Sequence, residues 1–208
     1  ENTLVLDFDS LHQLVKATLN DTASVSYEYD EQQRLVTTTF PDQSTRQFLY
    51  ENTDFPYYLT GVMDGKGNQA ITWTYDSAGR ATVSERADDN EKYVFEYHDN
   101  QTTVTNPLGK KTTYTFENFY GIKKVVRVEG HASSNCTAAN KSYTYFDNGL
   151  LKSKTDWKGV ITSYEYNDRG LLTREVVANG TTDEQTILTE WHQTLRLPTR
   201  ITEANRTT

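Results

Sequence analysis

The side chains of this 208-residue chain that could do chemistry are four histidines, one cysteine and a large set of carboxylates. The histidines are His12, His98, His131 and His192, and none of them has the spacing of metal ligands. The lone thiol, Cys136, has no partner for a disulfide, and it lies in a Ser/Ala/Asn-rich stretch without a nucleophile motif. The sequence therefore predicts no metal site, no cofactor and no catalytic group among these residues.

Carboxylates could act as an acid–base pair, as in glycoside hydrolysis, if two of them lay close together. The chain has 29 Asp and Glu residues, so a close pair could arise by chance. Asp30, Asp76, Asp147 and Asp168, however, recur after similar aromatic residues, whereas a catalytic residue is normally singular. The chain also lacks Gly-x-Ser-x-Gly, His-Glu-x-x-His and P-loop motifs. We therefore predict that the chain is not an enzyme and that these aspartates are structural.

Aromatic residues beside Asp and Asn suggest a different chemistry, carbohydrate binding, in which a ring supports the sugar and polar groups bind its hydroxyls. The chain has 14 Tyr, 8 Phe and 3 Trp, and most of these rings follow a repeat that predicts packing within a sheet. Aromatic residues outside that repeat are the better candidate carbohydrate contacts, and they are Phe55, Tyr57, Tyr58, Trp157 and Trp191. A carbohydrate-binding module at the cell surface is therefore the alternative function.

Charge and hydropathy exclude two further classes. The net charge is −8 and there is no cluster of Lys and Arg, which argues against a nucleic-acid partner. No stretch of 18 apolar residues is present, so we expect no membrane insertion by this segment. The chain opens on strand-like sequence without an initiator Met, and we expect it to be a segment of a longer protein that carries the localisation signal elsewhere.

The elements that position these residues follow an internal repeat of about 21 residues. Each repeat contains two aromatic residues separated by one residue. The pairs are Tyr27/Tyr29, Phe48/Tyr50, Trp73/Tyr75, Phe95/Tyr97, Tyr114/Phe116, Tyr143/Tyr145 and Tyr164/Tyr166. Residues at i and i+2 share one face of a strand but lie on different sides of a helix. The residues between them are mostly polar or small, so the pattern predicts strands with one packed face and one wet face.

A turn motif follows several of the pairs. Asp or Asn can hold a turn with its side chain, and Gly supplies a positive φ. The clearest copies are Asp76 to Gly79 and Asn167 to Gly170, while Asp30 is followed by Gln33 where the others have Gly. We interpret the copy that ends at Gly149 as having one extra residue before Asp147. A second set of turns, such as Asp64 to Gly67, lies between the pairs, so each unit is predicted to be strand, turn, strand, turn.

Two stretches depart from the repeat. Residues 1–24 match it less well than residues 25–201 do. Residues 11–19 have apolar positions with helical spacing, but we favour strand because everything downstream is β. An insertion at about residues 129–141, which contains Cys136, is predicted to form an exposed loop.

The repeated Tyr-x-Tyr-Asp-x-x-Gly-Arg/Leu, best seen at residues 73–80 and 164–171, resembles the YD repeat of RHS proteins. Similar repeats occur in bacterial polymorphic toxins, wall-associated proteins, toxin-complex C subunits and teneurins. The resemblance implies a ribbon of antiparallel β-hairpins that curves as part of a hollow shell. In bacterial members the shell is a container for a C-terminal toxin domain. The family's terminal autoproteolysis segment is absent here, so the resemblance suggests an interior or early piece of a shell.

These observations together predict a single array of YD repeats over residues 1–208, all β, with no catalytic function. We expect it to encapsulate or scaffold the toxin or effector domain of a larger secreted or cell-surface protein. Its expected partners are the other repeats and the toxin domain of that protein. A cut ribbon has open strand edges, so self-association through those edges is also expected.

Overall fold

The computed structural model of the chain describes residues 2–87, 91–132, 137–203 and 206–207. It divides into two compact units, Glu1–Phe95 and Glu96–Thr208. The described residues contain strands and turns but no α-helix, and hence no helix that could span a membrane. The predicted all-β fold of antiparallel hairpins is confirmed.

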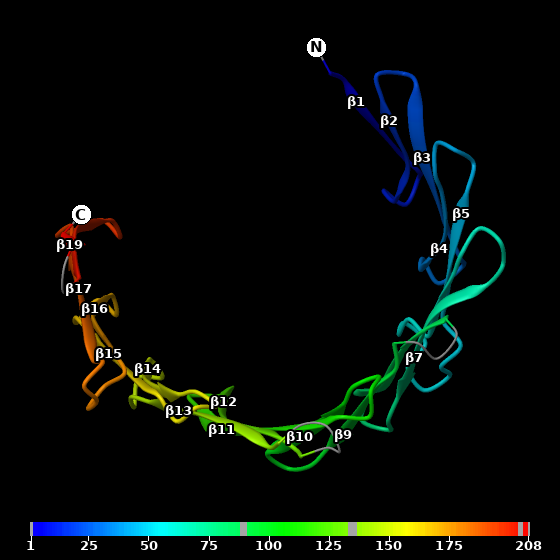
Figure 1. Cartoon of the computed structure of the whole chain (residues 1–208). Coiled ribbons are helices and arrows are strands. Elements are labelled where there is room, and N and C mark those ends of the chain that lie inside the picture. The colour runs from blue at the N-terminus through cyan, green and yellow to red at the C-terminus, as the bar shows by residue number, and fades with distance from the viewer. Residues whose placement is uncertain (1, 88–90, 133–136, 204–205, 208) are drawn as a thin grey trace. The chain divides into compact units, whose positions relative to one another are not determined.

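In the first unit each strand pairs with the next one along the chain in antiparallel fashion (Figure 1). Its strands are β1 (Leu4–Phe8), β2 (Leu14–Leu19), β3 (Ala23–Tyr29), β4 (Leu35–Thr39), β5 (Thr45–Leu49), β6 (Gly61–Met63), β7 (Gln69–Tyr75) and β8 (Ala81–Arg86). Strand β9 (Tyr93–Tyr97) contains the boundary between the units. Residues 14–19 are a strand, as the sequence analysis favoured.

The second unit repeats this arrangement. Its strands are β10 (Gln101–Thr105), β11 (Lys111–Phe119), β12 (Ile122–Gly130), β13 (Ala139–Tyr145), β14 (Leu151–Thr155), β15 (Ile161–Tyr166), β16 (Leu172–Val177), β17 (Gln185–Trp191), β18 (Pro198–Glu203) and β19 (Arg206–Thr207). Each strand of this unit thus forms an antiparallel hairpin with the strand that follows it in the sequence.

The second aromatic residue of four predicted pairs ends its strand beside a β-bulge, and these residues are Tyr29, Tyr75, Tyr145 and Tyr166. The register shifts between Glu28 and Tyr29 in β3, and between Thr74 and Tyr75 in β7. Strands β13, β15 and β17 shift in the same way before Tyr145, Tyr166 and Trp191. Because a bulge increases the local twist and redirects a side chain, it sets the direction in which the second aromatic residue leaves the strand.

The turn after β3, β7, β13 or β15 has five residues and two backbone hydrogen bonds, whereas the turn after β17 closes from His192 to Leu197. In the copy that begins at Asp76, the Asp76 N–H donates to the Arg80 carbonyl and the Gly79 N–H donates to the Asp76 carbonyl, both at 2.9 Å. The Asp76 carboxylate accepts from the backbone N–H groups of Ala78 and Arg80 at 3.0 and 2.9 Å. The fourth residue, Gly79, has a φ of 75°, which an L side chain rarely adopts. At the equivalent place Gln33 adopts a φ of 62° without being glycine.

The turn after β13 corrects the interpretation made from the sequence. The Phe146 N–H donates to Leu150 and the Gly149 N–H donates to Phe146, both at 2.8 Å, as in the other turns. The prediction of an extra residue before Asp147 is therefore wrong, because Phe146 itself occupies the first position of the turn. Asn148 then accepts from the Leu150 N–H at 3.0 Å in place of the missing Asp.

The structure has little interior. The buried apolar residues are Val62 in the first unit and Tyr164, Leu171 and Val176 in the second. Several buried positions carry threonine instead, and the Thr103 and Thr113 hydroxyls share a hydrogen bond of 2.9 Å between β10 and β11. Stability must therefore come largely from ladder hydrogen bonds and side-chain contacts between neighbouring hairpins rather than from a deep core.

The less regular segments take part in the same architecture. The β1–β2 hairpin has the same turn, in which Asp9 accepts from the N–H groups of Leu11 and Gln13 at 2.8 Å. Strand β1 pairs with β2 in the first unit, and its Leu4 and Phe8 are 62% and 58% exposed. Self-association through this edge stays a prediction. The predicted loop at 129–141 begins inside β12 and ends inside β13, and Cys136 lies outside the described residues.

Two glycines of the first unit allow a matched test of the turn after β7. A Cβ on Gly79 would lie 3.0 Å from Tyr58 Oη and 3.2 Å from Phe55 Cε1, whereas a Cβ on Gly67 would meet nothing within 4 Å. Both glycines have positive φ, so we expect Gly67→Ala to lower the free energy of unfolding by about 1 kcal/mol.

Gly79→Ala should cost about 1 kcal/mol more, because the aromatic rings must move. Urea unfolding of the two variants measures the difference. Equal losses in the two variants would show that the rings do not pack against this turn.

Candidate functional site

The second aromatic residue of several repeats donates a hydrogen bond to a backbone carbonyl of an earlier strand or its flank. Tyr75 Oη donates to the Leu59 carbonyl at 2.7 Å, and Tyr145 Oη donates to the Val125 carbonyl at 2.8 Å. Tyr29 and Tyr50 donate in the same way to Leu14 and Leu35, at 3.0 and 3.1 Å. In the last repeat Trp191 Nε1 donates to the Leu172 carbonyl at 2.7 Å. We call these five bonds the aromatic tethers.

The surroundings raise the pKa of several tyrosine hydroxyls of the repeat and lower the pKa of the turn carboxylates Asp64 and Asp76. Burial raises the pKa of four hydroxyls, those of Tyr50, Tyr75, Tyr145 and Tyr166. The backbone N–H of Arg80 lowers the pKa of Asp76, and the Arg80 guanidinium lowers it further at 2.8 Å. The N–H groups of Asn68 and Lys66 lower the pKa of Asp64. These carboxylates are therefore hydrogen-bond acceptors in a scaffold rather than general acids.

A second set of contacts joins neighbouring turns. Lys124 Nζ donates to the Gly149 carbonyl at 2.6 Å and lies 5.2 Å from the centre of the Tyr145 ring. Arg34 pairs with Asp30 at 2.6 Å and also donates to the Pro56 carbonyl. The most extensive contact is that of Arg169, whose guanidinium donates to four carbonyls of residues 192–195. These contacts were not predicted, because the sequence pattern does not say which turns meet.

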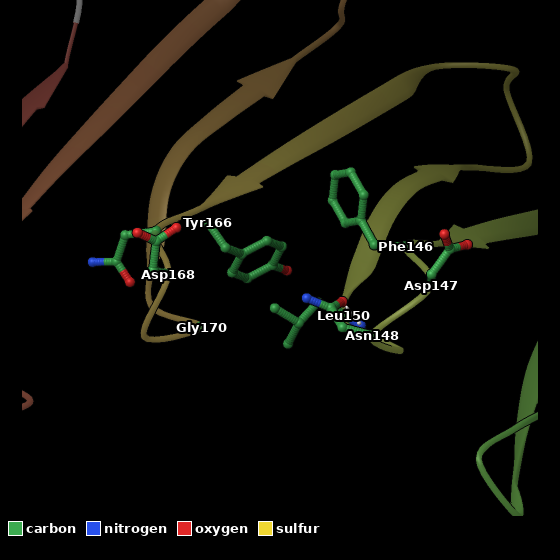
Figure 2. Close-up of a pocket in the computed structure, with 8 residues that line it drawn as sticks. Phe146, Asp147, Asn148, Leu150, Tyr166, Asp168 and Gly170 are labelled. Atoms are coloured by element: carbon green, nitrogen blue, oxygen red, sulfur yellow. Dashed lines mark hydrogen bonds between the residues drawn. The ribbon is translucent and has the colours of Figure 1, made fainter.

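A pocket of about 460 Å³ lies between the turns that follow β13 and β15 (Figure 2). The Phe146 and Tyr166 rings meet edge to face with centroids 6.3 Å apart. In Figure 2 the Tyr166 hydroxyl points from the second turn toward Leu150 and Asn148 of the first. No hydrogen bond joins this hydroxyl to a described residue, unlike the hydroxyls of the aromatic tethers. The pocket thus opens where Phe146 replaces the usual Asp and Tyr166 makes no tether.

A second pocket, of about 520 Å³, lies beside the turn after β14. Trp157 forms one wall and is 58% exposed, and Lys158 Nζ lies 5.0 Å from its ring centre. Asn140 and Asp156 supply polar atoms around the same hollow. An exposed ring beside amide and carboxylate groups is the arrangement that sugar binding requires.

The other candidate carbohydrate residues have different surroundings. Tyr57 is 66% exposed, whereas Tyr58 stacks on Phe55 at 4.9 Å and meets Tyr75 edge to face at 5.1 Å. Trp191 is one of the aromatic tethers. Tyr57 and Tyr58 belong to the first unit, and the two tryptophans belong to different hairpins of the second unit.

No catalytic constellation emerges among the residues that the structure describes. Within those ranges no three His, Cys, Asp or Glu side chains lie close enough to hold a metal ion. The side chains of Asp30 and Asp76 accept hydrogen bonds from backbone N–H groups of their turns. In the turns after β13 and β15 the acceptors are Asn148 and Asn167, and not Asp147 and Asp168 as the sequence predicted. Asp147 and Asp168 line the pocket between Phe146 and Tyr166.

Comparison with protein families finds a match to the family described as Teneurin YD-shell, over residues 2–96 and again over residues 81–187. A curated relative is the tRNA3(Ser)-specific nuclease WapA of Bacillus spizizenii, which is 33% identical over 176 residues. The aligned part covers 78% of this chain and 7% of that protein. The chain therefore corresponds to a small part of that relative.

Two crystal structures share the fold. TcdB2-TccC3 without its hypervariable C-terminal region superposes with a TM-score of 0.70 at 14% identity, covering 95% of this chain and 12% of that one. TcdB2-TccC3-TEV superposes with a TM-score of 0.52 at 13% identity, covering 97% and 15%. At these identities the likeness concerns the fold of the hairpins.

The aromatic tethers can be tested by removing single hydroxyls. Tyr75→Phe removes the donor to the Leu59 carbonyl, and we expect a loss of about 1 kcal/mol in the free energy of unfolding. Tyr166→Phe is the matched control, because its hydroxyl has no partner among the described residues, and it should change stability little. Urea unfolding of both variants checks this, and an equal loss in the two would contradict a structural role for the tether.

Proposed function

Because the chain belongs to the Teneurin YD-shell family, we propose that it is a non-catalytic segment of a shell wall that helps to enclose the effector domain of a larger secreted or cell-surface protein. The single observation that carries the proposal is the repetition of the chemical groups. The same Asp or Asn turn and the same tether occur in one hairpin after another. A wall needs such uniform joints, whereas a catalytic site needs a group that occurs once.

The thin sheet also supports this proposal. A strand such as β2 presents some residues to one side and others to the opposite side, and few residues of either unit are buried. Large apolar side chains such as Ile122 and Leu195 remain 63% and 51% exposed. A wall of this kind gains stability by contact with further repeats and with an enclosed polypeptide.

The curated relative fits the same arrangement. Its name describes a tRNA nuclease, and this chain aligns with 7% of its length. In our proposal the aligned part is wall, and the activity of a protein of this kind lies outside the wall. The parent of this chain would then carry its effector beyond the segment described in this structure.

Enclosure can be tested in the full-length parent protein with a protease. We expect its C-terminal region to resist proteinase K while the wall is intact. A Tyr75→Phe/Gly79→Ala variant should weaken the wall and expose that region, with Gly67→Ala as the control for glycine strain alone. Rapid cleavage of the C-terminal region in the unmodified protein would count against enclosure.

Carbohydrate binding is the second candidate, favoured by the exposed Trp157 ring at the wall of the 520 Å³ pocket. Glycan-array binding of the folded chain tests it. We expect any carbohydrate signal to fall at least about tenfold in Trp157→Ala, because the ring supplies the stacking surface. Trp157→Phe, which keeps a ring, should retain part of the signal. Binding that survives Trp157→Ala would place the sugar elsewhere, and no binding by the unmodified chain would leave only the wall.

A further inference from the structure

The turn that follows β17 begins with a histidine, whereas the turns after β3, β7 and β15 begin with Asp or Asn. His192 comes directly after Trp191, at the position that Asp76 and Asn167 take after Tyr75 and Tyr166. Its Nδ1 accepts hydrogen bonds from two backbone N–H groups, those of Thr194 and Leu195, both at 3.2 Å. The Thr194 hydroxyl lies 3.4 Å from the same nitrogen. The imidazole therefore accepts backbone hydrogen bonds in this turn, as the Asp76 carboxylate does in the turn after β7.

These hydrogen bonds require one protonation state of the ring. Nδ1 can accept a hydrogen bond only when it carries no proton, as in the neutral imidazole with its proton on Nε2. The protonated ring has an N–H at both nitrogens and offers no acceptor. Histidine is also the side chain that ordinarily changes charge between about pH 8 and pH 5. Asp and Asn at the same position keep their acceptor oxygen throughout this range.

Arg169 closes on the same loop from the turn after β15. Its Nη1 donates to the carbonyls of His192 and Gln193, both at 2.7 Å, and its Nη2 donates to those of Thr194 and Leu195 at 3.1 and 2.9 Å. The four carbonyls can reach the guanidinium only while residues 192–195 keep this turn conformation. The hydrogen bonds to His192 Nδ1 stabilise the same conformation, so the Arg169 contact and the His192 contact depend on each other.

Protonation of His192 would act on this loop twice. It would remove the acceptor for the two N–H groups, and it would place a positive charge on the residue whose carbonyl the Arg169 guanidinium binds. The other charged groups on the surrounding elements are Asp168 in the turn after β15, Arg196 in the loop, and Glu190 and Arg200, which pair at 3.6 Å between β17 and β18. The loop thus lies among both acidic and basic side chains, and Arg169 is the one whose hydrogen bonds to the loop carbonyls are described above.

We propose that His192, Arg169 and residues 192–197 form a pH-sensitive latch between the turn after β15 and the hairpin of β17 and β18. The latch is closed at neutral pH, when His192 accepts the two N–H groups. It opens on mild acidification and frees the Arg169 guanidinium together with the loop. Acidification then loosens one joint of the sheet while the turns held by Asp and Asn stay closed.

Amide exchange with water, measured by NMR on the whole folded chain, tests the latch. Rates for Thr194 and Leu195, corrected for the intrinsic effect of pH, should rise about tenfold between pH 7.5 and pH 5.5 because a hydrogen bond is lost. In His192→Asn the loop should stay protected at both values, since Asn serves as the acceptor in the turn after β15.

His131→Asn is the control for a histidine elsewhere, because His131 Nε2 contacts the Thr113 hydroxyl and not this loop. This variant should keep the full response of Thr194 and Leu195. The proposal is overturned if the unmodified chain is equally protected at both pH values. It is also overturned if His192→Asn shows the same acid-induced increase. The Arg169 side-chain N–H groups provide a second readout, and their exchange with water, corrected for the intrinsic effect of pH, should become faster at pH 5.5 only when His192 is present.

Discussion

A hydrogen bond from the tip of an aromatic side chain to a carbonyl of an earlier strand is the interaction on which the rest of this sheet depends. Strand pairing sets the register of each hairpin, but the few buried residues, such as Val62 and Val176, supply little packing between hairpins. The bulges before Tyr75 and Tyr145 direct these rings back toward preceding strands. The hydroxyl or indole N–H then finds a fixed acceptor. Tyr in place of Phe at these positions is thus explained by its polar end as much as by its ring.

Much of this architecture can be read from the sequence because it is local. A ring at i and i+2, followed by Asp-x-x-Gly, fixes the face, the end of the strand and the turn within eight residues. The copy from Trp73 to Arg80 folds as its pattern indicates, and Gln33 shows that the turn tolerates a non-glycine residue at positive φ. The pattern gave a wrong prediction at Phe146. Asp147 suggested that the turn begins one residue later, whereas the backbone keeps the usual five-residue turn from Phe146 to Leu150.

The sites were less predictable because they depend on which turns meet. Nothing in the sequence near Arg169 says that its guanidinium reaches four carbonyls of a loop more than twenty residues later. The Phe146–Tyr166 pocket likewise needs two turns to face each other. Trp157 and Trp191 looked alike as rings outside the repeat, yet one is exposed and the other is a tether. A clue for Trp191 was available, since it follows a strand and precedes a turn as the tyrosines do.

The aromatic tethers share one direction along the chain. In each of the five the carbonyl comes first in the sequence and the donor follows it by 15 to 20 residues. During synthesis from the N-terminus, each new ring therefore emerges when its acceptor already exists. A ribbon with this polarity can be assembled as it is made, each hairpin docking onto finished sheet, and no tethered segment has to wait for sequence that the ribosome has not yet added.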